Sequence, residues 1–201
     1  IKNNESFIID NIKGDEAWRN ENFQRDYIKE ACKKFSKDDI LIISDVDEIP
    51  SKEKLKFIKS CHFKKIAPIA FEQYLFHLNC NFLKLESWLG SIVTTIQLCN
   101  DYSPNQHRRD RNKISHFNNA GWSFSSFGEA QKVKKKLESI AHKEFNNNKF
   151  KNIEHIINCQ KTGADLFFRD VQSQEINRNF FPKDLLNLME QNPIFYFGSN
   201  T

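Results

Sequence analysis

A short apolar run that ends in three carboxylates most constrains how this chain can fold. Residues 40–51 read I-L-I-I-S-D-V-D-E-I-P-S, so four apolar residues lead directly into Asp45, Asp47 and Glu48, and Pro50 stops regular structure. A short all-apolar run between polar residues is typical of a strand buried on both faces. Open α/β sheets bind ligands where their strands end. The stretch therefore predicts a buried strand over residues 40–44, followed by a carboxylate loop at a ligand site.

The density of acid in this loop indicates a bound cation. Neighbouring carboxylates are costly to hold together unless a cation or a proton neutralises them. Carboxylate oxygens suit hard cations, which proteins usually share with a phosphate. We therefore predict that Asp45 and Asp47 bind Mg²⁺ or Mn²⁺. The simpler alternative is a polar turn in which the Asp side chains cap the following backbone.

The same string also resembles the motif of haloacid-dehalogenase-type phosphohydrolases. There the first Asp, here Asp45, is a nucleophile and the second is an acid. That pattern normally continues with Gly and then Thr or Val, whereas Glu48, Ile49 and Pro50 follow here. A Mg²⁺-dependent phosphohydrolase is thus the enzymatic alternative.

The elements around the loop favour a mixed α/β fold. Apolar residues spaced by four predict a helix over residues 15–35, and Ser51 can cap a second helix over residues 52–60. Further helices are expected at residues 129–145, 152–160 and from Pro182, and strands at residues 6–10, 66–78, 90–98, 113–117 and 122–127. No long helix separates the middle strands, so antiparallel or mixed pairing is expected.

Composition bounds the class of protein. With 201 residues, 28% charged and 39% apolar, the chain suits one globular domain, residues 1–201. A net charge of +4 permits an anionic substrate, but it is lower than the positive charge typical of a nucleic-acid-binding domain. No apolar run approaches the roughly 18 residues of a membrane span. The five cysteines form no C-x-x-C pair, which favours a reduced, cytoplasmic setting.

Candidate site residues also lie outside the loop. In residues 119–128, Gly121 allows close backbone approach, while Trp122 and Ser125 offer the stacking face and hydroxyl that suit a carbohydrate. The pattern alone, however, favours an ordinary edge strand with core aromatics. In a helix over 129–145, Glu144 falls on the apolar stripe and is a candidate base; a frayed helix end that leaves Glu144 in water is the alternative. Arg108, Arg109 and Arg111, in the polar stretch 101–112, can meet a diphosphate, although a solvated loop is the default there.

An ordered set of motifs resembles glycosyltransferase family 17, which includes the β-1,4-mannosyl-glycoprotein β-1,4-N-acetylglucosaminyltransferases. The segments are Trp18 with Q-R-D at 24–26, D-V-D-E-I-P-S at 45–51, A-G-W-S-F-S-S-F-G at 120–128, K-L-E-S-I-A-H-K-E at 136–144, T-G-A-D-L-F at 162–167 and the P-x-x-L-L…N-P ending at 182–193. The chain departs from the family pattern at Ser123, where His is usual.

The resemblance implies a GT-A-like mixed sheet flanked by helices, and transfer of a sugar, such as N-acetylglucosamine, from a UDP-sugar to a glycan hydroxyl with inversion. It implies that Asp45 and Asp47 hold the metal, and that a carboxylate, Glu144 or else Glu48, is the base. The residues that we assign to substrate binding are Gly121, Trp122, Ser125, Arg109 and His142. Because the acidic motif comes so early, the first β-α unit is expected to be missing. A non-catalytic carbohydrate-binding module is the non-enzymatic alternative.

Overall fold

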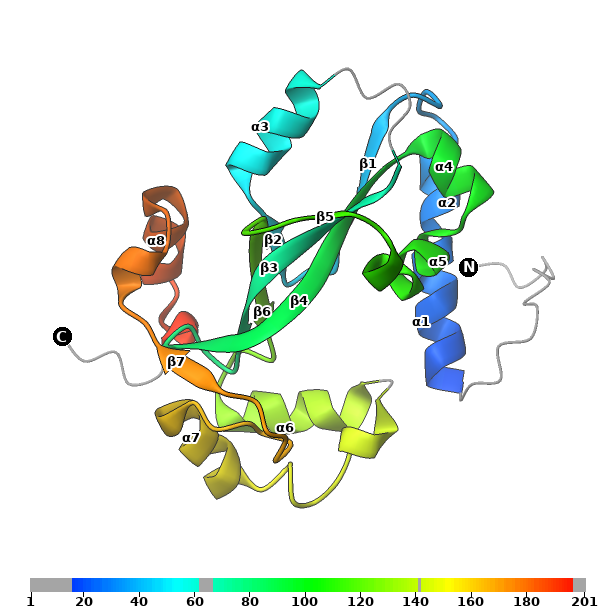
Figure 1. Cartoon of the computed structure of the whole chain (residues 1–201). Helices are drawn as coiled ribbons and strands as arrows, with labels where there is room; N and C mark the ends of the chain where they lie inside the picture. Colours follow the sequence, from blue (N-terminus) through cyan, green and yellow to red (C-terminus); the bar gives the residue numbers. More distant parts are fainter. Residues whose placement is uncertain (1–15, 62–66, 141, 197–201) are drawn as a thin grey trace.

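The computed structural model describes residues 16–61, 67–140 and 142–196 (Figure 1). The helices are α1 (Glu16–Asp26), α2 (Ile28–Cys32), α3 (Lys52–Ser60), α4 (Ile96–Asp101), α5 (Pro104–Arg109), α6 (Ala130–Ser139), α7 (Ile153–Thr162) and α8 (Lys183–Glu190). Short 3-10 turns are η1 (Arg111–Lys113), η2 (Lys143–Phe145), η3 (Arg178–Phe180) and η4 (Pro193–Phe195). The strands are β1 (Ile40–Ile43), β2 (Glu48–Pro50), β3 (Ile69–His77), β4 (Phe82–Thr95), β5 (His116–Phe117), β6 (Gly121–Ser125) and β7 (Ser173–Glu175). The strand expected at residues 6–10 lies outside the described residues.

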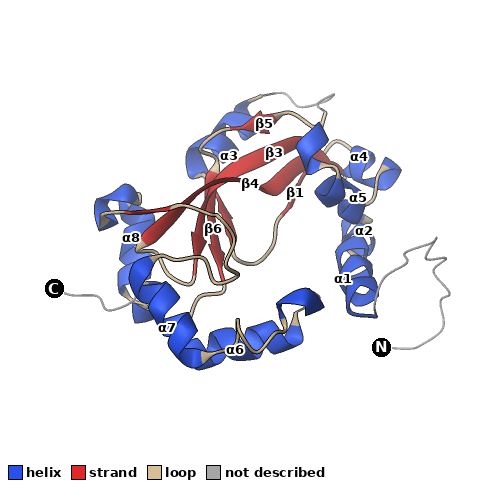
Figure 2. Ribbon diagram, turned by 60° about the horizontal axis from the view of Figure 1, so that its bottom comes forward, coloured by secondary structure: helices blue, strands red, loops and turns tan. Residues whose placement is uncertain are grey.

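The strands form one mixed sheet, as predicted. Its order is β1-β4-β3-β6-β2, with β5 beside β3 and β7 beside β4. β3 pairs in parallel with β5 and β6, and the other pairs are antiparallel. β4 is long enough to pair with β1 near one end and β7 near the other. Figure 2 shows the helices arranged around this sheet, with α6 and α7 along one side. The predicted mixed α/β fold is confirmed.

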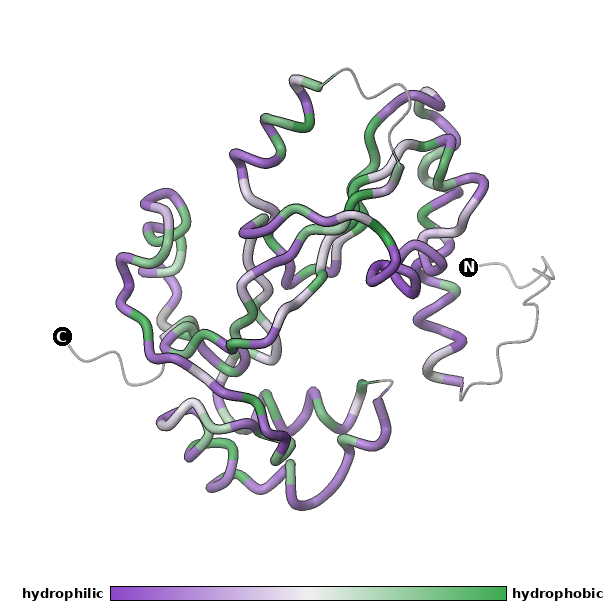
Figure 3. Tube along the Cα trace, viewed as in Figure 1, coloured by the Kyte–Doolittle hydropathy of each residue, from purple (hydrophilic) through white to green (hydrophobic). Residues whose placement is uncertain are grey.

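The apolar strand that precedes the carboxylate loop lies at the edge of the sheet. Figure 3 shows β1 as a continuous hydrophobic stretch. Ile43 is buried, but Ile40 and Ile42 are 39% and 38% exposed. The prediction of a strand buried on both faces is therefore wrong, because β1 pairs only with β4 and one of its faces stays partly open to solvent.

Strand periodicity divides the side chains of the central sheet between two faces. Phe76 of β3 and Phe124 of β6 pack in a core cluster with Met189 of α8. Their neighbours along the strands, such as Leu75 and Ser123, point to the opposite face, since successive side chains alternate across a sheet. A second core cluster joins α6 and α7, and a third seats α3 against β3 and β4. The face that α8 leaves uncovered carries the site described below.

Helix ends explain two further differences from the predictions. The helix expected over 129–145 ends at Ser139, because Ile140 is extended. The stretch 101–112, expected as a loop, instead contains α5 and the start of η1, and the strand expected over 90–98 ends at Thr95, where α4 begins. Ser103 caps α5 by accepting a hydrogen bond from the backbone of Gln106, and Pro104 occupies its first turn.

The remaining predicted helices are present. The helix expected over 15–35 is divided at Tyr27 into α1 and α2. Ser51 caps α3, as predicted, by accepting from Lys54 N. Asn152 caps α7, and Gly163 ends it with a left-handed backbone, φ +72°. None of the helices in the described part of the chain has the length and apolar composition needed to cross a membrane.

Candidate active site

A cleft of about 840 Å³ runs over the open face of the sheet. Its floor consists of side chains from β3, β4 and β6 that share one strand face: Leu75, His77, Lys84, Glu86, Trp88, Ser123 and Ser125. One wall comes from α1 and another from the end of α6 and the residues that follow it: Asn20, Glu21 and Gln24 on α1, and Lys136, Leu137, Ser139, Ile140 and His142. Asp45 and Asp47 of the carboxylate loop (residues 44–48) complete the lining at one end.

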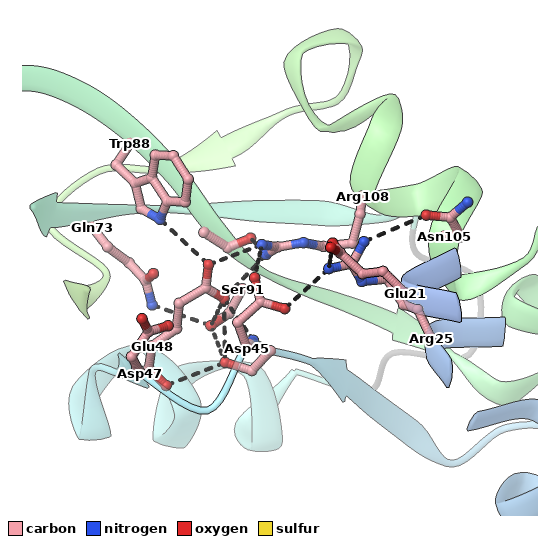
Figure 4. Close-up of polar contacts among 12 residues, drawn as sticks. Glu21, Arg25, Asp45, Asp47, Glu48, Gln73, Trp88, Ser91, Asn105 and Arg108 are labelled. Carbon is pink, nitrogen blue, oxygen red and sulfur yellow. Dashed lines mark hydrogen bonds and ion pairs between the residues drawn. The ribbon is translucent and has the colours of Figure 1, made fainter. Parts of the chain in front are cut away.

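A buried ion pair anchors the carboxylate loop (Figure 4). Arg108 of α5 presents its guanidinium edge to Glu48, with Nη1–Oε2 and Nη2–Oε1 both 3.0 Å apart. The side chain of Glu48 is 1% exposed and that of Arg108 5%. Arg108 Nη1 also donates to the carbonyl of Gly90 at 2.6 Å. Such a two-bond pair fixes orientation as well as charge, so it ties α5 and β4 to the loop.

Glu48 is surrounded by further donors. Its carboxylate accepts hydrogen bonds from Trp88 Nε1 at 3.3 Å and from the Asp45 backbone N–H at 3.0 Å. Ser91 Oγ adds a contact of 3.4 Å. Glu48 is not among the residues that line the cleft. This geometry favours a structural role for Glu48 over the predicted role as base.

Asp45 is also bound by arginines. Its Oδ2 lies 2.6 Å from Arg108 Nη2, and its Oδ1 lies 3.3 Å from Arg25 Nη2. Arg25, on α1, contacts Glu21 at 3.0 Å as well. Asp45 is nevertheless 42% exposed and faces the cleft. The arginines supply the neutralising charge that the sequence assigned to a metal ion.

Asp47 is the carboxylate of this loop that is not engaged by an arginine. It lines the cleft with 32% of its side chain exposed, and the nearest cation is Lys136 Nζ at 4.0 Å. Burial raises the pKa of Asp47, and Lys136 only partly opposes that effect. Asp47 is held in place through its carbonyl, which accepts from Phe124 N at 2.8 Å. Its carboxylate is therefore available to a ligand.

The loop fits a metal ion only in part. Among the described residues, no group of three or more His, Cys, Asp or Glu side chains could hold one. Glu48 is saturated, and Asp45 would have to exchange an arginine contact for the metal. However, Mg²⁺ is commonly bound by one or two carboxylates together with substrate phosphates. Asp47, with one oxygen of Asp45, fits that kind of site.

The arginines of the stretch 101–112 differ in whether they reach the cleft. Arg109 is exposed, bonds to Gln106, and does not line the cleft. Arg111 does line it, with its guanidinium 4.6 Å above the ring centre of Trp88. Arg111 makes no ion pair or conventional hydrogen bond with the described residues, so its donors are free to meet an anion. Within this stretch the cleft-lining role therefore belongs to Arg111 and not to Arg109.

The segment 120–128 is split by strand alternation. Ser123 and Ser125 line the cleft, whereas Trp122 packs in the core cluster on the other face. Gly121 has φ +144°, and a Cβ there would lie 2.3 Å from the carbonyl oxygen of Ile49. Ser125 therefore faces the cleft. Trp122 packs in the core, as the ordinary-strand alternative predicts, and Gly121 accommodates β2, so the observed positions of these two residues do not support the predicted contact with a sugar.

The early end of α6 changes the position of Glu144. It is 60% exposed instead of facing inward, and its Oε1 lies 2.7 Å from His142 Nδ1. His142 lines the cleft and meets the ring of Trp18 edge-on at 4.6 Å. The hydrogen bond from His142 lowers the pKa of Glu144. The two residues, which an unbroken helix would point in different directions, form a pair at the cleft.

Several site residues were not found from the sequence. Arg25 lies within the Q-R-D segment, whose Asp26 accepts a hydrogen bond from the backbone of Asn105 and so fixes the start of α5. Arg108 was considered for a diphosphate but not as the partner of Glu48. Lys84 and His77 belong to strands whose cleft-facing side could be recognised only after β3 and β4 were placed.

Five of the six motif segments meet at this one cleft although they are far apart in the chain. Gln24, Asp45, Ser125, His142 and Phe167, one from each of five segments, all contribute to its lining. A family model described as glycosyltransferase family 17 matches residues 4–190. The chain belongs to glycosyltransferase family 17. No curated protein and no solved structure gives a significant match.

Membership in glycosyltransferase family 17 makes the protein a glycosyltransferase, which acts on a sugar donor and an acceptor. The cleft has the size and polarity for such substrates, since its lining combines acidic, basic and hydroxyl side chains. The site residues assigned from the sequence now divide into those that line this cleft (Asp45, Asp47, Ser125, His142) and those that do not (Glu48, Arg109, Gly121, Trp122, Glu144).

Proposed function

We propose that this protein transfers a sugar, such as N-acetylglucosamine, from a UDP-sugar to a glycan hydroxyl, with inversion and with Mg²⁺ or Mn²⁺ as cofactor. The observation that carries the proposal is the convergence of five separate family segments on one cleft that holds the carboxylate of Asp47 together with the cationic side chains of Lys136 and Arg111. The donor diphosphate is assigned to this end of the cleft.

The residues at the donor end provide complementary contacts for a diphosphate. Asp47, assisted by one oxygen of Asp45, would hold the cation, which when bound supplies positive charge to the departing UDP. The planar guanidinium of Arg111 offers paired N–H donors that match the oxygens of a phosphate. Because Arg111 already stacks on Trp88, its side chain loses little conformational entropy when it binds. Lys136 places a second positive charge 4.0 Å from Asp47.

The base is assigned to the pair of His142 and Glu144. With Glu144 accepting the Nδ1–H of His142, the lone pair of the imidazole is on Nε2. That nitrogen can take the proton of an acceptor hydroxyl in the cleft. Glu144, predicted as the base itself, would then act through His142.

A donor panel tests the proposal. The full-length protein is incubated with UDP-sugars and oligosaccharide acceptors, with Mn²⁺ or with EDTA, and UDP release is measured. We expect Mn²⁺-dependent release, and we expect Asp47→Asn to lower kcat/KM by on the order of 100-fold or more. Asp184→Asn, on the surface of α8, is the matched control and should leave the rate unchanged.

Three results would contradict the proposal. Equal activity of D47N and wild type would exclude the role of Asp47. Hydrolysis of an aryl phosphate that Asp45→Asn abolishes would identify a phosphohydrolase instead. Sugar binding with no turnover of any UDP-sugar would indicate a non-catalytic module.

A further inference from the structure

The end of the cleft away from the carboxylate loop contains a buried lysine. Lys84 of β4 is 4% exposed as a whole residue, and it shares the cleft-facing side of its strand with Glu86 and Trp88. Its Nζ donates to the carbonyl of Gly163 and to Ser173 Oγ, each at 2.9 Å. Both partners are neutral. No carboxylate among the described residues lies within 4.0 Å of this ammonium group, and its third hydrogen has no acceptor there.

The nearest acidic groups are committed to another cation. Asp165 binds Arg169 through both oxygens, at 2.7 Å and 3.2 Å, and one oxygen also accepts the backbone N–H groups of Phe167 and Arg169. Glu86 lies 4.0 Å from the same guanidinium. The charge of Lys84 is therefore not matched by a direct partner. Burial of an ion without such a partner is costly.

A second polar group beside Lys84 also lacks a partner. His77 Nδ1 is buried and makes no hydrogen bond with the described residues. The ring lines the cleft and stacks on Phe167 with centroids 5.6 Å apart. Burial, reinforced by the charge of Lys84, lowers the pKa of His77 to about 3. The imidazole is thus neutral, and it can carry its hydrogen on Nδ1 and donate it to a ligand.

The location separates this cluster from the donor phosphates. Lys84 is paired with Leu75, Leu75 with Ser123, and Ser123 with Glu48. Three strand spacings therefore lie between Lys84 and the carboxylate loop, which is roughly 14 Å. A substrate that lies along the cleft would meet the two ends with different parts of its structure.

We propose that His77, Lys84 and Arg169, the Lys84 site, bind an anionic substituent of a sugar, a carboxylate or a phosphate ester. The inference rests on the proposed function, because it assigns a ligand group to the second end of the same substrate cleft. The buried ammonium supplies the charge, His77 supplies a neutral donor, and Arg169 lies at the more exposed side with its guanidinium over Phe167. The substituent belongs either to the acceptor glycan or to the donor sugar. In both cases the group that the site binds is an anion attached to a sugar ring.

Matched sugar pairs test the Lys84 site. Calorimetric titrations compare methyl glucuronide and glucose 6-phosphate with methyl glucoside, each with UDP and Mn²⁺ present, and compare UDP-glucuronic acid with UDP-glucose. We expect at least one anionic ligand to bind about tenfold more tightly than its neutral counterpart, as for one charge-assisted hydrogen bond. Preference among the glycosides assigns the substituent to the acceptor, and preference among the nucleotide sugars assigns it to the donor.

Variants decide whether Lys84 is responsible. Lys84→Met should abolish the preference, Lys84→Arg should retain part of it, and Lys135→Met, which removes an exposed lysine of α6, should retain all of it. Cooperative thermal unfolding and unchanged UDP binding by K84M show that the variant is folded. No anionic preference in wild type, or an undiminished one in K84M, overturns the inference and leaves the proposed function intact. Failure of wild type to bind UDP overturns both.

Discussion

At the carboxylate end of the cleft the buried Arg108 faces two carboxylates, whereas at the other end the buried Lys84 faces two neutral oxygens. Both cations are about 95% buried, and both are anchored to a backbone carbonyl. Only the first has its charge matched within the fold. The comparison indicates that the Arg108 pair holds the loop that carries Asp47, while Lys84 is available to a ligand.

The comparison predicts that removal of Arg108 has the largest effect on stability. Arg108→Met leaves the carboxylate of Glu48 buried without its partner, which should cost about 3–5 kcal/mol of unfolding free energy. Arg109→Met, at an exposed neighbouring position, should change it by less than about 0.5 kcal/mol. Urea unfolding of the two variants measures the difference. A change below 1 kcal/mol in R108M, relative to wild type, would show that the pair does not hold the loop.

Asp165 should have the next largest effect, and one that depends on pH. Burial acts to raise the pKa of Asp165, but hydrogen bonds from Arg169 outweigh it and hold the pKa below its ordinary value. The pair therefore stabilises the fold above the ordinary carboxyl pKa of about 3.9, and this contribution is lost as the pH falls through the lowered pKa.

Asp165→Asn should consequently lose about 1.5–3 kcal/mol at pH 7. The difference between D165N and wild type should shrink as the pH is lowered toward 3. Thermal unfolding measured across this range checks both points. A difference that stayed constant with pH would mean that the charge of Asp165 is not what stabilises the fold.

Two tryptophans offer a smaller, paired test of the network at the carboxylate end. Trp88 Nε1 donates to Glu48, whereas Trp122 Nε1 is buried without a partner among the described residues. Trp88→Phe should therefore lose about 0.5–1.5 kcal/mol from the missing hydrogen bond. Trp122→Phe removes an unpaired donor and should lose less. Chemical denaturation that ranked the two variants in the opposite order would contradict the assigned network.

Removal of Lys84 should have the smallest effect on stability. In Lys84→Met the carbonyl of Gly163 still accepts a hydrogen bond from Ser173 Oγ at 2.7 Å, and a buried charge disappears. The unfolding free energy should stay within about 1 kcal/mol of wild type. A loss as large as that of R108M would mean that Lys84 is part of the structural framework, and the contrast between the two ends would fail.

Local patterns in the sequence were sufficient for the carboxylate loop and for most helices. Ser51 caps α3 through a contact within a few residues, so its role could be predicted. The mixed pairing of the middle strands followed from the lack of long helices between them. Asp47 and His142, which the D-x-D string and the later motifs indicated, both line the cleft.

Contacts between distant segments could not be predicted in the same way. Arg108 and Glu48 are 60 positions apart, so nothing near either residue indicated that one would neutralise the other. The exposed face of β1 depends on its place at the sheet edge, which an apolar run alone does not determine. The helix expected to reach residue 145 ends at Ser139, so Glu144 takes the exposed position that the sequence allowed as an alternative.

Calorimetric titration of UDP into the full-length protein, with and without Mn²⁺, tests most directly whether the carboxylate loop holds a donor diphosphate through a cation. The account predicts that Mn²⁺ strengthens UDP binding to wild type, and that Asp47→Ala weakens it by about 10–100-fold in Mn²⁺. It also predicts that D47A and wild type bind UDP alike when EDTA removes the metal. Equal binding of UDP by wild type and D47A in Mn²⁺ would contradict it.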